Sequence, residues 1–244
     1  MSKIYDDFFK SINFDIGLLK QFKKIYVLVT GGMDSTLLWE YIHSHYPFAT
    51  PVNFWNPYET NAVLTGMKNL PGFVEIKPVK KVEYAKIMDE AFLQLPNARR
   101  ALAAGKYSKT LFPCCYFFKH KLAFRGKLLK DEGSCVISGI KAGDGRTRRI
   151  WTCKLRKRDT FIHRHKTGQT YVYPLRDYWK REFPREVQDE LRVKYPGIGH
   201  TGCYVCPVLV LFEDRRIERG RRYDESLRKA ASLGVGKGVL DELR

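Results

Sequence analysis

The stretch KKIYVLVTGGMDSTLLWEYI, residues Lys23–Ile42, decides the fold of this protein. Its apolar, β-branched part, Ile25–Thr30, predicts a buried strand, and the apolar spacing within Ser35–His45 predicts a helix. Two glycines, Gly31 and Gly32, stand between them. A strand that passes into a helix through glycines leaves bare backbone N–H groups at the positive end of the helix dipole. Proteins bind phosphate at such helix ends.

The side chains of this glycine loop suit a nucleotide that carries a magnesium ion. Phosphate oxygens can approach the main chain closely where there is no Cβ, and the hydroxyls of the loop add donors. Asp34, whose charge repels phosphate, is expected to hold Mg²⁺ against the phosphates. The candidate nucleotide-binding residues are Thr30, Gly31, Gly32, Met33, Asp34, Ser35 and Thr36. The alternative is a tight turn that only packs the helix on the strand.

Strand-like and helix-like patterns alternate through the first 150 residues. Strands are expected at Thr50–Trp55, Phe73–Pro78 and Ser134–Ile140, and helices at Ile4–Phe22, Glu59–Leu70, Val82–Leu95 and Leu122–Leu129. This alternation predicts an α/β fold with an open, mostly parallel sheet of five strands and helices on both faces.

The pattern changes after Arg149. Trp151–Arg156 reads as a short strand, and Phe161–Tyr173, broken at Lys166–Gly168, reads as a hairpin. Helices are expected at Glu186–Lys194 and Asp224–Leu233. We therefore expect an N-terminal helix (1–22), a nucleotide-binding core (23–150) and a basic C-terminal part (151–244).

The charge of the chain favours an anionic partner. The 244 residues contain 44 Lys and Arg against 26 Asp and Glu, a net charge of +18. Residues 141–222 alone carry 21 Lys and Arg and 10 Asp and Glu. Such a field attracts nucleotides, DNA, RNA or anionic lipid. No apolar run reaches the roughly 18 residues of a membrane span, and the first residues do not read as a signal peptide, so a cytoplasmic protein is expected.

Four of the six cysteines form two pairs that suggest one metal centre. Cys114 and Cys115 are adjacent, and Cys203 and Cys206 form a C-x-x-C motif 88 positions after the second of them. Sulfur ligation of this kind suits a [4Fe–4S] cluster or Zn²⁺. Zinc usually takes two C-x₂₋₄-C knuckles, so the adjacent pair favours the cluster. The third interpretation is that these cysteines are buried free thiols. In the metal-bound interpretations, Cys203 and Cys206 of the C-terminal part would complete the site.

Two of these features resemble known families. TGGMDS is similar to the S-G-G-x-D-S signature of PP-loop ATP pyrophosphatases, with Thr30 in place of the first Ser. The CC…CxxC pattern is similar to that of assimilatory adenosine-phosphosulfate reductases. Together they resemble the phosphoadenosine-phosphosulfate reductase family within the adenine-nucleotide α-hydrolase-like superfamily, over roughly residues 20–215. Ser138–Ile150 resembles the family's segment of phosphate-facing basic residues, which adds Gly139 to the nucleotide-binding residues. Tyr173–Trp179 resembles another segment of the family.

The chain departs from the reductases of that family in two ways. No cysteine follows Cys206, whereas the reductases attack with a cysteine in a C-terminal tail. The glycine loop is nearly intact, which implies ATP as the substrate. The resemblance therefore favours an enzyme that releases pyrophosphate, adenylates a nucleic acid and sulfurates it, with a sulfur-donor protein as a further partner. The candidate catalytic residues are Asp34, Lys141, Arg146 and Arg149, with Arg148 as a further cation.

Basic residues also alternate with aromatic ones around the predicted hairpin. Arg156–Arg158 and His163–Lys166 lie near Trp151, Phe161, Tyr171 and Tyr173, a combination typical of single-strand binding. The alternative is that these aromatics belong to the core. Cys135 and Cys153 are expected to be packing residues.

Two other functions remain open on the sequence. One is a sulfonucleotide reductase that takes its thiol from a partner. The other is a non-catalytic nucleotide sensor or nucleic-acid-binding subunit. For the ATP-dependent enzyme, the acceptor is DNA, tRNA or a small molecule, and the sequence is compatible with an oligomer.

Overall fold

The computed structural model describes residues 3–54, 62–77, 131–144, 146–165 and 168–198. The strands are β1 (Lys24–Leu28), β2 (Thr50–Phe54), β3 (Val74–Ile76), β4 (Ser134–Ile137), β5 (Ile162–Arg164) and β6 (Thr170–Val172). The helices are α1 (Lys3–Ser11), α2 (Met33–His45), α3 (Ala62–Met67), α7 (Arg146–Lys157) and α8 (Arg185–Lys194), with short 3₁₀ helices η1 (Ile16–Gln21) and η4 (Ala142–Asp144). The chain divides into two compact units, and the described residues, apart from Phe54 and Lys77, lie in the first.

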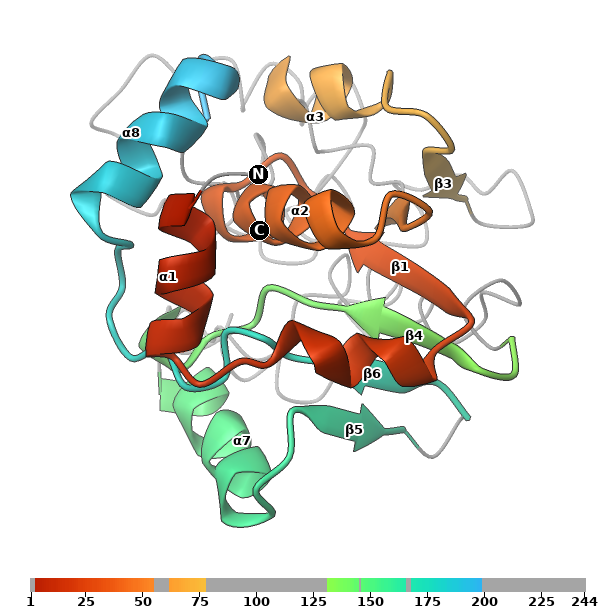
Figure 1. Ribbon diagram of the computed structural model, residues 1–244, viewed down its shortest axis with the longest axis vertical. Coiled ribbons are helices and arrows are strands. Elements are labelled where there is room, and N and C mark those ends of the chain that lie inside the picture. The colour runs from red at the N-terminus through yellow and green to blue at the C-terminus, as the bar shows by residue number, and fades with distance from the viewer. Residues whose placement is uncertain (1–2, 55–61, 78–130, 145, 166–167, 199–244) are drawn as a thin grey trace, which may run out of the picture. The chain divides into compact units, whose positions relative to one another are not determined.

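The strands form one sheet in the order β3-β2-β1-β4-β6-β5 (Figure 1). β1 is parallel to β2 and β4, β4 is parallel to β6, and only β5 runs antiparallel in the pairings described. The predicted α/β class and mostly parallel sheet are confirmed. The described sheet has six strands rather than five, because the hairpin β5–β6 joins the edge of β4. The sheet therefore continues past residue 150, where the sequence suggested a boundary.

The segment that was expected to form a strand at Trp151–Arg156 is helical, and that prediction is wrong. Trp151, Cys153 and Leu155 alternate with polar residues and so imitate a strand. In the structure the buried residues are Thr152 and Leu155, three apart, with Trp151 partly buried. That spacing belongs to one face of a helix.

The expected helix Ile4–Phe22 is two shorter helices. α1 ends at Ser11, and Asn13 takes a left-handed conformation with φ of 58°, which a helix cannot continue. Asp15 then caps η1 by accepting a hydrogen bond of 2.8 Å from the Gly17 N–H. Asn and Asp favour turns and caps because their short side chains bond to the nearby backbone.

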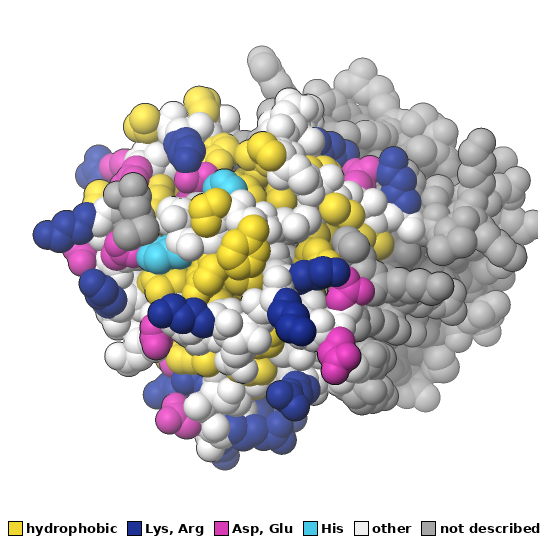
Figure 2. All heavy atoms as spheres, turned by 45° about the vertical axis from the view of Figure 1, so that its right-hand side comes forward, with side chains coloured by type: hydrophobic (Ala, Val, Ile, Leu, Met, Phe, Trp, Pro, Cys, Tyr) yellow, Lys and Arg dark blue, Asp and Glu magenta, His cyan; other side chains and the backbone are white. Residues whose placement is uncertain are grey.

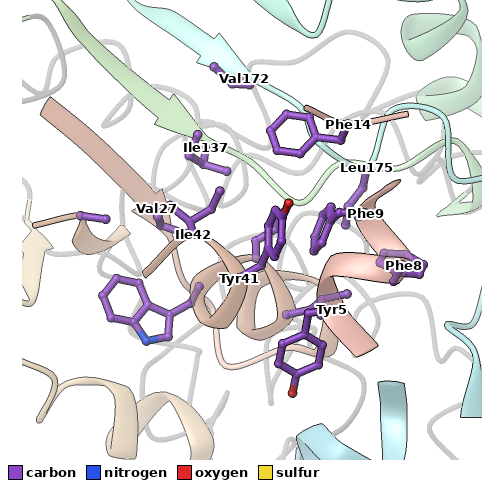
Figure 3. Close-up of a cluster of buried hydrophobic side chains, with 14 of the residues drawn as sticks. Tyr5, Phe8, Phe9, Phe14, Val27, Tyr41, Ile42, Ile137, Val172 and Leu175 are labelled. Carbon is purple, nitrogen blue, oxygen red and sulfur yellow. The ribbon is translucent and has the colours of Figure 1, made fainter. Parts of the chain in front are cut away.

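One face of the sheet packs against α1, α2 and η1. The pairing register places Val27 beside Ile137 and Ile137 beside Val172, so the three side chains share this face. Figure 3 shows them meeting the aromatic side chains of the helices, where Phe9 stacks on Tyr41 with ring centroids 3.9 Å apart. The same core contains Tyr5, Phe8, Phe14, Ile42 and Leu175. α8 packs against both α1 and α2 (Figure 1).

The opposite face of the sheet contacts α7. Tyr171 and Tyr173 flank Val172 along β6 and so point to this other face. Trp151 of α7 lies edge-on to Tyr173, with ring centroids 4.4 Å apart. Helices on both faces of the sheet are thereby confirmed.

Several expected elements match the structure closely, and others lie outside the described residues. β1, α2, β2, β4, the hairpin and α8 fall where the sequence placed them, α3 ends at Met67 rather than Leu70, and β3 is shorter than expected. The predicted helices Val82–Leu95, Leu122–Leu129 and Asp224–Leu233 lie outside the described residues. In the part of the chain that is described, no helix is long and apolar enough to span a membrane.

Candidate nucleotide-binding site

The glycine loop turns sharply and ends at an open helix terminus. Val29 still pairs with β2 through a hydrogen bond of 2.9 Å from its N–H to Val52 O. Gly31 then adopts a φ of 73°, which glycine reaches without the strain of a Cβ. Gly32 is the N-cap of α2, and among the described residues no side chain caps the helix there. The first N–H groups of α2 therefore lack the capping side chain that many helices provide.

Hydroxyl groups inside the loop hold its shape. The backbone N–H of Thr30 donates to Ser35 Oγ at 3.1 Å, and Ser35 Oγ in turn donates to Gly32 O at 3.0 Å. Thr30 Oγ1 lies 3.1 Å from the same Ser35 oxygen. The Ser35 hydroxyl thus stabilises the turn. Thr36 differs, because its Oγ1 is buried and has no hydrogen-bond partner among the described residues.

A second loop meets the glycine loop at the end of the neighbouring strand. β4 is followed by Gly139, where a Cβ would lie 3.3 Å from Asp34 Cβ and 3.5 Å from Ser35 N. Glycine lets this loop approach the first turn of α2 closely. In the sheet β1 lies between β2 and β4, so the chain leaves β1 for β2 on one side and returns to β4 on the other. Ligands of open α/β sheets bind outside the carboxyl ends of the strands at such a switch point.

Two predicted catalytic residues form a partly buried ion pair at this point. Lys141 Nζ donates to Asp34 Oδ1 at 2.5 Å, and Asp144 Oδ1 lies 3.6 Å from the same nitrogen. The Lys141 side chain is only 5% exposed, and its ammonium lies 4.6 Å from the centroid of the Phe183 ring. Burial raises the pKa of the Asp34 carboxyl above its ordinary value, and the Lys141 ammonium opposes that rise.

The other predicted cations lie on α7, directly after Asp144. Arg148 pairs with Asp144 and so extends the network from Lys141 to the surface. The described contact of Arg149 is with the ring of Trp179, whose centroid lies 5.7 Å from the guanidinium carbon. Arg146 is the first residue of α7. The structure therefore brings together Asp34, Lys141 and Arg148, and places Arg149 beside Trp179.

Three residues of this region were given no role by the sequence analysis. Asp144 follows Lys141 by three positions, a spacing that could have indicated their pairing. Trp179 was recognised only as part of a family segment. Phe183 lies 42 positions after Lys141, and nothing in the local pattern connects the two.

The described residues suit a magnesium ion and a triphosphate. The carboxylates of Asp34 and Asp144 both face the Lys141 ammonium. Mg²⁺ is usually bound by one or two carboxylates together with phosphate oxygens. The uncapped start of α2 and the unpartnered Thr36 hydroxyl offer donors for the phosphates. Within the described ranges, no group of three or more His, Cys, Asp or Glu residues could hold a metal alone.

The predicted cluster ligands Cys114, Cys115, Cys203 and Cys206 lie outside the described residues. Cys135 is fully buried in β4, which confirms it as a core residue, and burial raises the pKa of its thiol. Cys153 is half-buried on α7.

Among solved structures, sixteen chains match this protein. No protein-family model matches this chain, and no curated protein sequence matches it. The crystal structure of NAD+ synthetase from Burkholderia Pseudomallei is similar to it with a TM-score of 0.35 and 16% sequence identity, over 94% of this chain and 90% of that chain.

Proposed function

We propose that the protein is an ATP-using enzyme of the PP-loop type, which splits ATP between the α- and β-phosphates. One observation carries this proposal: the left-handed Gly31 opens an uncapped helix at the switch point of the sheet, with the Asp34–Lys141 pair beside it. A phosphate chain finds donors, a cation and carboxylates for a metal in one place.

The roles of the residues follow from their positions. The first N–H groups of α2 would donate to the β- and γ-phosphate oxygens. Asp34 and Asp144 would hold Mg²⁺, which supplies positive charge to the pyrophosphate leaving group. Lys141, now paired with Asp34, would neutralise charge that develops on the α-phosphate, and Arg146 and Arg149 in the first turn of α7 would add to this field.

In the proposed reaction an acceptor oxygen attacks the α-phosphorus. The new P–O bond forms as the bond to pyrophosphate breaks, and the acceptor oxygen loses its proton to water. The products are an adenylated acceptor and magnesium pyrophosphate. Positioning and electrostatic stabilisation supply most of the catalysis in phosphoryl-type transfers, which suits a site built from main-chain donors and cations.

The finer proposal is that the chain is a member of the phosphoadenosine-phosphosulfate reductase family and sulfurates a nucleic acid in the cytoplasm. It is supported by the motif TGGMDS and by the CC…CxxC pattern of the sequence. A [4Fe–4S] cluster on Cys114, Cys115, Cys203 and Cys206 would then be expected, with Zn²⁺ as the alternative. Anaerobic purification followed by iron and zinc quantification tests this part: about four irons per chain support it, and one zinc without iron contradicts it.

The test of the ATP proposal is pyrophosphate release from Mg²⁺–ATP, with matched glycine variants. Gly31→Ala places a Cβ at a φ of 73° in the loop, and Gly72→Ala does so at a φ of 72° away from it. Both should lose similar stability, about 1–2 kcal/mol. Only Gly31→Ala should also lose ATP binding and pyrophosphate release.

Other outcomes would point to the alternative functions. Turnover with a phosphosulfate nucleotide and an added thiol, but not with ATP, would indicate a reductase. Tight ATP binding without turnover, with DNA and RNA present, would indicate a sensor.

A further inference from the structure

We propose that Trp179 and the exposed side of α7 form a binding surface for single-stranded nucleic acid, beside the candidate nucleotide site. The surface is defined by Trp179, Arg149, Arg156 and Lys157. Its role as the acceptor site depends on the proposed function, but the binding itself does not.

Trp179 is an exposed aromatic ring set among cations. It is 40% exposed, and the guanidinium carbons of Arg149 and Arg156 lie 5.7 and 5.4 Å from its ring centroid. The two arginines stand two turns apart on α7, so both reach the same ring from one helix. A nucleobase stacks on such a ring, and its flanking phosphates pair with the guanidinium groups.

The charge of α7 is of one sign. The helix RTRRIWTCKLRK contains six Lys and Arg and no acidic residue. Arg146, Arg148 and Arg149 lie in its first turn, where the helix dipole disfavours positive charge. Of these, Arg148 is compensated by Asp144, and further along the helix Arg156 Nε lies 3.3 Å from Asp177 Oδ1. An anionic ligand along this helix would relieve the remaining repulsion.

The space-filling view agrees with this distribution. In Figure 2, Lys and Arg side chains gather at the lower end of the described part, which is the level of α7 in Figure 1. The whole chain carries a net charge of +18, so a polyanion is attracted to it from a distance.

A direct backbone contact fixes Trp179 next to the candidate nucleotide site. The Gly143 N–H donates to Tyr178 O at 3.2 Å, and a Cβ at Gly143 would lie 2.8 Å from Trp179 O. Gly143 stands between Lys141, which contacts Asp34, and Asp144, which pairs with Arg148. A strand stacked on Trp179 would therefore lie close to the proposed adenylation chemistry.

The exposed aromatic differs from those that the sequence suggested. Tyr171 and Tyr173 were candidates for base stacking, yet both are buried, as the alternative interpretation held: Tyr173 packs against Trp151 of α7, and Tyr171 stacks on Tyr173. Burial raises the pKa of both phenols, which also reflects their dry surroundings. Trp179 is 40% exposed, whereas Trp151 is only partly exposed.

Single-stranded nucleic acid fits this surface better than a protein or a folded duplex. A duplex hides its bases inside the stack, so it could use the cations but not the ring. A protein partner would normally bury a larger apolar patch, whereas Ile150 is the one exposed large apolar side chain among the described residues of α7.

The test is fluorescence anisotropy of labelled twelve-nucleotide RNA and DNA strands, without ATP. Trp179→Ala should weaken binding about tenfold or more, and Trp179→Phe should retain most of it. Arg156→Ala should reduce the slope of log affinity against log salt concentration by about one, which is the contribution of one phosphate contact. Arg185→Ala is the matched control, because Arg185 also pairs with an aspartate, Asp189, but lies on α8 with its side chain 92% exposed. The affinity of the Arg185→Ala variant for both strands should stay within twofold of that of the parent protein.

The proposal is overturned if the RNA and DNA strands bind to the Trp179→Ala variant as tightly as to the parent protein. It is also overturned if a duplex binds to the parent protein as tightly as a single strand does. Trp179-dependent binding to anionic vesicles, without binding to either strand, would also overturn it and indicate a membrane surface. Release of pyrophosphate from ATP without strand binding would contradict this surface alone. Strand binding without ATP turnover would contradict the proposed function alone.

Discussion

Lys141 Nζ lies 2.5 Å from Asp34 Oδ1, although the two residues are 107 positions apart in the chain. Asp34 stands in the first turn of α2, and Lys141 follows β4. The parallel pairing of β1 with β4 brings their carboxyl ends together and so makes this contact. The pair joins the two loops that a nucleotide would have to bridge.

Replacement of Lys141 should therefore be costly. Lys141→Met leaves the Asp34 carboxylate, which is only 27% exposed, without its cation. We expect a loss of about 2–4 kcal/mol in the free energy of unfolding, measured by urea denaturation, because a partly buried charge is left unpaired.

The matched control for that variant is Lys24→Met. Lys24 pairs with Asp131 at 2.6 Å and over the same 107 positions, but its side chain is exposed. Its loss should leave the urea midpoint nearly unchanged. Equal midpoints for the two variants would show that the Lys141–Asp34 pair contributes no more than a surface pair.

Nucleotide affinity should depend on the protonation of Asp34. Its pKa is raised by burial, so the carboxylate that would hold Mg²⁺ is lost at a higher pH than an ordinary aspartate would lose it. Binding of Mg²⁺–ATP, followed by calorimetry, should weaken as the pH falls towards this pKa. Asp34→Asn should bind weakly at every pH and show no such step. An Asp34 carboxyl that titrates at or below 3.8 by carbon NMR would contradict the prediction.

The local part of the site could be predicted from the sequence. Gly31, Gly32 and Asp34 lie within a few positions of one another, and the strand–glycine–helix pattern alone places them on a phosphate-binding turn. Most of the described strands were found for the same reason, since β-branched runs and turn residues are local features.

The long-range part of the site could not be predicted in this way. The approach of Gly139 to Asp34 and of Lys141 to Phe183 depends on strand order, which the local pattern does not encode. Trp151–Arg156 was misread because a short amphipathic segment can satisfy a period of two and a period of 3.6 at once. The exposure of Trp179 also emerges only from the fold, since aromatic residues are usually at least partly buried.

Stability should fall below neutral pH through His163. Burial, His165 and Arg158 lower the pKa of His163 below its ordinary value of 6.5. The unfolded chain then binds this proton more readily than the folded one, so the folded state loses stability as the pH falls below about 6.5. His163→Gln should reduce that loss in urea midpoints measured from pH 7 to pH 5. A His163 signal that titrates at or above 6.5 by NMR would be inconsistent with this explanation.

Gly143→Ala should disturb both the candidate site and the proposed surface. A Cβ at this position would lie 2.2 Å from Lys180 O and 2.6 Å from its carbonyl carbon, both of which are backbone atoms. The two loops must separate to accept it, at a cost of about 1–3 kcal/mol. Gly66→Ala is the control, because it lies in α3 and a Cβ there meets no described atom within 4 Å. Alanine should be neutral or stabilise α3 by up to about 1 kcal/mol. Urea denaturation gives both values, and ATP and strand binding of Gly143→Ala should fall together because one loop supports both sites. If only one of the two affinities changed, the loop would not be their shared support.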